Sequence, residues 1–149
     1  MSWFARHSAA LEAGATLVTA LVAVVALLGV KWQLDEADRL SALQSAREAY
    51  RGHLVLAVGA PDFAAPADGC AVLASAKGGA YRAFVDHLLY AAEQMLSVEA
   101  GWEPTFLAEI AGHQDYFCSV EGPVGDSDAV AAVISQFRSS GCPAKPTCQ

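Results

Sequence analysis

The sequence feature that most constrains the fold is an apolar run of eighteen residues without a charge, AGATLVTALVAVVALLGV at positions 13–30. Glu12 and Lys31 bound this run. As a helix it rises roughly 27 Å, close to the thickness of the hydrocarbon core of a bilayer. A lone segment inside hydrocarbon can satisfy its backbone polar groups only as a helix. The run therefore predicts one membrane-spanning helix near the N-terminus.

Aromatic residues flank this run, with Trp3 and Phe4 before it and Trp32 after it. Tryptophan prefers the membrane–water interface, where its ring sits at headgroup level. A helix between the two tryptophans rises roughly 44 Å, close to a full bilayer with its headgroups. No small-x-small site follows the apolar run, as a cleaved signal peptide would need. We therefore expect residues 1–32 to be an uncleaved signal anchor in the lipid bilayer.

One face of the predicted span carries small residues three or four positions apart. They are Ala15, Thr19, Ala23 and Ala26. Small side chains let a second helix approach closely, and such packing drives helix association within lipid. The face is therefore a candidate helix–helix interface, although the same spacing also arises by chance in an alanine-rich chain.

Beyond the anchor the chain is long enough for one small domain, expected over residues 33–141 and followed by a Pro-rich tail at 142–149. From residue 33 onward there are seven Lys or Arg and fifteen Asp or Glu residues, a balance of −8. Such a surface repels phosphate backbones, so nucleic acid is not an expected partner. The acidic residues are spread along the chain, which is typical of a solvated surface.

Apolar residues recur every three or four positions over 32–58, which predicts an amphipathic helix that continues directly from the span. Its predicted inner face is Leu34, Ala37, Leu40, Leu43, Ala46, Tyr50 and Leu54. Gly59 and Pro61 end this pattern, because glycine terminates helices and proline cannot continue them.

The same periodicity predicts further helices over 80–100, from Trp102 to near Ser119, and from Asp126 or Ser127 to Gly141. Two prolines make 61–69 a predicted loop, and the run 70–76 fits either a helical turn or a buried extended piece. The sequence thus predicts an all-α fold: one N-terminal transmembrane helix continuous with a small three- to four-helix extramembrane domain.

Four cysteines lie in the domain and its tail, at Cys70, Cys118, Cys142 and Cys148. An even number with two members in a Pro-rich tail favours disulfides in an oxidising compartment. Four cysteines permit three pairings, and the sequence does not choose among them. Free buried thiols and a metal site remain as alternatives, the latter without a C-x2-C pair to support it.

Charges near the span give two opposed indications of orientation. Basic residues alone favour a cytoplasmic domain, because Arg6 precedes the span and four follow it, Lys31, Arg39, Arg47 and Arg51. The acidic residues just after the span, together with the cysteines, favour export of the domain. We expect a bacterial inner-membrane protein with a periplasmic C-terminal domain, with the cytoplasmic orientation as the alternative.

Catalytic signatures are lacking in the sequence, which has no nucleophile elbow, phosphate loop or Walker motif. Of the three domain histidines, His113 lies on an apolar stripe, whereas His53 and His87 flank theirs. A di-iron bundle needs paired Glu-x-x-His motifs, which do not occur. Each histidine is therefore predicted to be a hydrogen-bonded core or boundary residue, and no catalytic activity, cofactor, metal or small-molecule substrate is expected.

Three fragments of the domain are AREAYRGHLVLA, YRAFVDHLLYAAEQML, and W-x4-L followed by HQDYF. They resemble a loose group of single-pass bacterial membrane proteins of no established function. The matching positions are Tyr50, Leu54, Tyr81 to Leu89, Trp102, His113 and Tyr116. The resemblance covers most of 46–117 and implies an anchor followed by helices. It assigns no site residue, and the cysteine tail departs from the group's pattern.

A span with a small-residue face, joined to a domain without chemistry of its own, favours an interaction protein. The sequence therefore predicts a non-catalytic accessory or scaffolding subunit of a larger inner-membrane complex of respiratory, photosynthetic or transport type. Its expected partners are integral membrane proteins of that complex. A stand-alone anchored adaptor or sensor that recruits a soluble partner is the alternative, and a haem- or metal-binding bundle is a more remote one.

Overall fold

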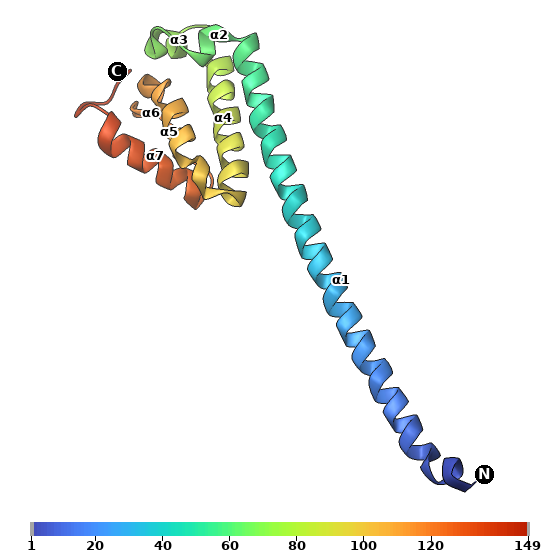
Figure 1. Cartoon of the computed structure of the whole chain (residues 1–149). Coiled ribbons are helices and arrows are strands. Elements are labelled where there is room, and N and C mark those ends of the chain that lie inside the picture. Colours follow the sequence, from blue (N-terminus) through green and yellow to red (C-terminus); the bar gives the residue numbers. More distant parts are fainter. Residues whose placement is uncertain (1, 149) are drawn as a thin grey trace. The chain divides into compact units, whose positions relative to one another are not determined.

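The computed structural model describes residues 2–148, with side chains described from Gly14 onward except at Ala100. The chain forms two compact units, Met1–Ser41 and Ala42–Gln149. Helix α1 (Ser2–Gly59) contributes to both, so the predicted continuity between the span and the first domain helix is confirmed (Figure 1). The all-α fold is also confirmed, since residues 2–148 hold no strand and only one isolated bridge, between Ser119 and Thr147.

The first unit consists of the N-terminal part of α1. Every side chain from Gly14 to Ser41 is exposed, including the large apolar ones at Leu17, Leu21 and Leu28. Among the described residues, α1 is the one helix long and apolar enough to cross a membrane, and its most apolar window has no buried residue. An exposed apolar surface of this length is unfavourable in water and suits hydrocarbon.

The second unit contains the rest of α1 and six further helices. They are α2 (Pro61–Ala64), α3 (Gly69–Ala74), α4 (Gly78–Val98), α5 (Glu103–Ala111), α6 (Gln114–Phe117) and α7 (Asp128–Gly141), with a short 3-10 turn at Ala100–Trp102. The Ser127 hydroxyl accepts a hydrogen bond from the Val130 N–H, as an N-cap does, so the predicted start of the last helix is confirmed.

Helix α4 supplies most of the core of this unit. Its buried side chains recur at helical spacing and include Tyr81, Phe84, Val85, Leu88, Ala92 and Met95. Helices α3 and α7 pack against α4, and α5 packs against α7 (Figure 1). Phe106 and Ile110 of α5 and Phe117 of α6 complete the centre of the core.

The predicted inner face of α1 is correct at Ala46 and wrong at Leu54, about two turns later. His53 is buried at 2% exposure, whereas Leu54 is 43% exposed. After Tyr50 the helical period allows either residue 53 or residue 54 to face inward. Leucine is expected there because it is the more apolar of the two. The His53 ring instead packs 4.9 Å, centroid to centroid, from the ring of Phe84. Leu34 and Leu40, also predicted to face inward, are exposed.

The helix predicted from Trp102 to Ser119 is interrupted. Helix α5 ends at Ala111, and α6 begins only at Gln114. Between them His113 adopts φ −117° and ψ 27°, outside the helical region. Its ring turns into the core, where it meets Tyr81. The predicted loop at 61–69 contains the single turn α2, and the open choice at 70–76 resolves to the short helix α3.

Two adjacent glycines at the start of α4 give a matched test of this packing. A Cβ on Gly78 would lie 2.2 Å from the Leu73 carbonyl oxygen, whereas a Cβ on Gly79 would meet nothing within 4 Å. Gly78→Ala should therefore lower the free energy of unfolding by about 1–3 kcal/mol. Gly79→Ala should raise it by up to about 1 kcal/mol, because alanine favours the helix. Denaturant unfolding followed by circular dichroism measures both, and equal midpoints for the two variants would contradict the packing of α3 against α4.

Candidate functional site

The small-residue face predicted on the span lies wholly in the exposed first unit. Ala15, Thr19, Ala23 and Ala26 are all exposed. Steps of four, four and three residues place them on one side of a helix. The Thr19 hydroxyl donates a hydrogen bond of 2.9 Å to the Ala15 carbonyl oxygen, so its polar group is satisfied within α1. A second helix could therefore approach this face closely without leaving the Thr19 hydroxyl as an unpaired hydrogen-bond donor. The use of the face as a helix–helix interface stays a prediction.

In the core of the second unit, His113 and Tyr81 form a buried pair. The Tyr81 hydroxyl lies 3.0 Å from His113 Nδ1, which matches the predicted hydrogen-bonded core histidine. Burial, and secondarily His53, lower the pKa of His113 to about 4, so the imidazole is neutral at pH 7. Burial likewise raises the pKa of Tyr81 to about 12, which keeps the phenol protonated. A protonated phenol facing a neutral imidazole can donate its hydrogen bond.

A second histidine pair lies between α1 and α4. The rings of His53 and His87 are 5.9 Å apart and nearly parallel, and the Nδ1 atoms of both are buried without a hydrogen-bond partner. Burial, with the neighbouring His87, lowers the pKa of His53 to about 4. The prediction that His53 lies at the edge of its helix face is therefore wrong, and its Nδ1 departs from the hydrogen-bonded expectation. No local sequence signal marks this pair, because it depends on how α1 packs against α4.

These histidines do not assemble a three-ligand metal centre in the part of the chain that the structure describes. The one group of three potential ligands there is Asp68, Cys70 and Asp115. Cys70 is in a disulfide. Asp68 accepts a hydrogen bond from Ala71 N–H, and Asp115 accepts one from Gly69 N–H. All three side chains are thus used to hold the start of α3 in place.

Of the three cysteine pairings that the sequence allows, the structure has Cys70–Cys148 and Cys118–Cys142. The Cα atoms are 4.9 Å and 5.4 Å apart, both ordinary spacings. The first bond ties the C-terminal tail to α3, and the second ties the end of α7 to the residue after α6. The Thr147 N–H also donates to the Cys118 carbonyl oxygen at 3.1 Å. The Pro-rich tail is therefore held against the domain.

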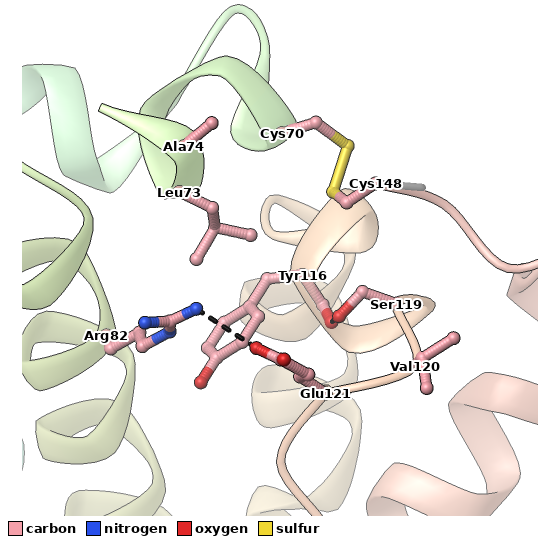
Figure 2. A pocket seen from close by; sticks show the side chains of 9 residues that line it. All are labelled: Cys70, Leu73, Ala74, Arg82, Tyr116, Ser119, Val120, Glu121 and Cys148. Atoms are coloured by element: carbon pink, nitrogen blue, oxygen red, sulfur yellow. Dashed lines mark hydrogen bonds and ion pairs between the residues drawn. A yellow bond between two sulfur atoms is a disulfide. The ribbon is translucent and has the colours of Figure 1, made fainter.

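Next to the Cys70–Cys148 disulfide lies an open cleft of about 350 Å³ (Figure 2). Its other lining residues come from α3, α4, α6 and the segment after α6, and are Leu73, Ala74, Arg82, Tyr116, Ser119, Val120 and Glu121. Arg82 Nη2 and Glu121 Oε2 are 3.2 Å apart, and the ring of Tyr116 lies beside this ion pair. The cleft therefore combines one cation, one anion and a phenol with apolar walls.

Tyr116 lines this cleft and is only 6% exposed. Burial raises the pKa of its phenol, Asp86 raises it further, and the guanidinium of Arg82 acts in the opposite direction. The hydroxyl is therefore protonated at neutral pH and available as a donor. No sequence motif marks this cleft, because Arg82 and Glu121 lie 39 residues apart in the chain.

No protein family, curated protein or solved structure matches this chain.

The two buried histidines predict a stability that falls in weak acid. In the unfolded chain each histidine binds a proton near pH 6.5, and in the folded domain only near pH 4. Between these values the unfolded state holds more protons, so the free energy of unfolding should fall as the pH drops from about 6.5 towards 4. The loss is at most about 3 kcal/mol per histidine. Urea midpoints at pH 7, 6 and 5 measure it.

His53→Leu provides the control for this pH dependence. The variant removes one of the two histidines that must be protonated on unfolding, so its fall in stability over the same range should be about half as large. A wild-type midpoint that stays flat from pH 7 to 5 would contradict the burial of neutral histidines.

Thiol labelling can test the disulfide pairing. Cys142 and Cys148 share one tryptic peptide, since Pro146 protects Lys145 from cleavage, so ordinary peptide mapping does not separate the alternatives. In Cys148→Ser, alkylation under denaturing, non-reducing conditions should label only Cys70. In Cys142→Ser it should label only Cys118. Exchange of these two labels, found by mass spectrometry, would overturn the pairing.

Proposed function

We propose that the chain is a non-catalytic, single-pass accessory or scaffolding subunit of a larger inner-membrane complex. The observation that carries this proposal is the exposed apolar part of α1 with its small-residue face. In this role the span packs against integral membrane proteins of the complex, and the domain is held at the membrane surface as a scaffold. Respiratory, photosynthetic and transport assemblies are the types of complex that such a subunit suits.

The physical case for the span as the assembly element comes from its side chains. Leucine and valine side chains gain little by leaving lipid for a neighbouring helix, so association has to come from close packing. Ala15, Ala23 and Ala26 allow that approach because they project little beyond the backbone. Thr19, with its hydroxyl already bonded to Ala15, adds contact area without a desolvation cost. The opposite side of α1, with Leu17, Leu21 and Leu28, suits lipid tails.

The two disulfides support a periplasmic location for the domain. Disulfides persist in oxidising compartments and are rare in the reducing cytosol. Both bonds join the C-terminal tail to the body of the domain. A domain whose C-terminal tail is held by two disulfides suits the periplasm. We therefore propose the periplasmic orientation instead of the cytoplasmic one, which the basic residues alone favour.

Enlarging the small-residue face tests the proposal. The variant Thr19→Leu/Ala23→Leu should release the protein from its complex, because branched side chains prevent close helix approach. Ala20→Leu is the matched control, since Ala20 lies roughly a quarter turn away from that face. Native gel electrophoresis of membranes solubilised in mild detergent measures the assembly. An unchanged complex in the double variant, or equal loss in the control, would contradict the proposal.

An exposed apolar patch at the end of α1 favours the second candidate, an anchored adaptor that recruits a soluble partner. The patch consists of Leu54, Val55 and Val58, which share one side of the helix and are exposed by 43%, 67% and 84%. Neighbouring apolar side chains in water are a common mark of a protein-binding surface. In this case Val55→Ser/Val58→Ser would remove a soluble partner from the purified protein, and the span variants would not.

A further inference from the structure

We propose that the cleft in Figure 2 binds a small aliphatic α-amino acid as a zwitterion, with its carboxylate on Arg82, its ammonium on Glu121 and its side chain against Leu73 and Val120. This inference concerns the domain alone and does not depend on the role proposed for the span. The cleft has a volume of about 350 Å³, enough for a ligand of this size.

Arg82 is the basic residue of the domain best placed to bind a ligand carboxylate. Arg138 is committed to structure, since it donates to the carbonyl oxygens of Phe117 at 2.9 Å and Pro123 at 3.0 Å. Arg82 forms an exposed ion pair with Glu121 through Nη2 at 3.2 Å, and its guanidinium also acts on the Tyr116 phenol. A guanidinium has five N–H donors, and a carboxylate can take two of them at once. The ring of Tyr116 lies beside Arg82 and lines the same cleft.

Glu121 explains why the ligand carries an ammonium group as well. A ligand with a carboxylate alone would have to displace Glu121 from Arg82 and leave two anions at one cation, in a protein of net charge −7. Asp86 lies close enough to act on Tyr116, which adds to the negative surroundings. A zwitterion instead exchanges one exposed ion pair for two and brings no net charge. The Glu121 side chain, 79% exposed, is free to turn towards the ammonium.

The walls of the cleft determine which amino acids fit. Val120 is 80% exposed beside the ion pair, so its apolar side chain faces water when the cleft holds no ligand. Leu73 and Ala74 of α3 lie on the facing wall, and the Cys70–Cys148 disulfide closes one end. An aliphatic ligand side chain between Leu73 and Val120 removes apolar surface of both from water. Leucine should therefore bind better than glycine.

The test uses the full chain in detergent micelles with L-leucine as the probe. The amide resonances of Val120 and Glu121 should shift in a saturable manner by NMR, and glycine should bind at least about fivefold more weakly. Two analogues separate the charges: 4-methylpentanoate lacks the ammonium group, and isoamylamine lacks the carboxylate. Each should bind at least about tenfold more weakly than leucine, because each leaves one side of the ion pair without a partner. Empty micelles with the same ligands control for partition into detergent.

Charge variants give a matched comparison, because Arg51 and Glu48 form a second exposed ion pair away from the cleft, at 3.3 Å. Arg82→Gln and Glu121→Gln should each weaken leucine binding about tenfold or more, whereas Arg51→Gln and Glu48→Gln should leave it unchanged. All four residues are on the surface, so the variants should fold. Absence of saturable shifts up to about 10 mM leucine, equal binding of 4-methylpentanoate, or tighter binding by Glu121→Gln would overturn the proposal.

Discussion

Helix α1 is exposed and apolar over one part and packed in the domain over the other, and the rest of the structure depends on this helix. From Gly14 to Ser41 all side chains are exposed, and the apolar run has no charge, which suits hydrocarbon. Over its C-terminal part Ala46 and His53 are buried in the domain core. One continuous run of helical hydrogen bonds serves both parts, because it satisfies the backbone independently of solvent. The side chains alone mark the change from the exposed apolar part to the part packed in the domain.

The small domain needs supports beyond its apolar core. Its core consists of α4 side chains and of a few apolar side chains from α5, α6 and α7. Domains of about a hundred residues bury limited apolar surface, and cross-links compensate by restricting the unfolded chain. The two disulfides span 78 and 24 residues along the chain. The first also forms one end of the cleft, so the bond that fixes the tail helps to shape the proposed ligand site.

Local sequence signals predicted the span, α4 and α7, because periodicity, glycine ends and the Ser127 cap act over a few residues. They placed Leu54 inward instead of His53, which is wrong, because both fit the helical period and only packing against Phe84 selects the histidine. They missed the break at His113, which is driven by its contact with Tyr81 on another helix. The cysteine pairing and the cleft also lay beyond reach, because residues far apart in the chain form them.

The most direct test of the central claim is to purify the tagged full chain from its own membranes in mild detergent and to quantify every co-eluting protein by mass spectrometry. An accessory or scaffolding subunit should bring with it one or more integral membrane proteins in near-stoichiometric amounts, and their identity would define the complex. Elution of the chain alone, as a homo-oligomer, or with soluble proteins only would contradict the subunit account.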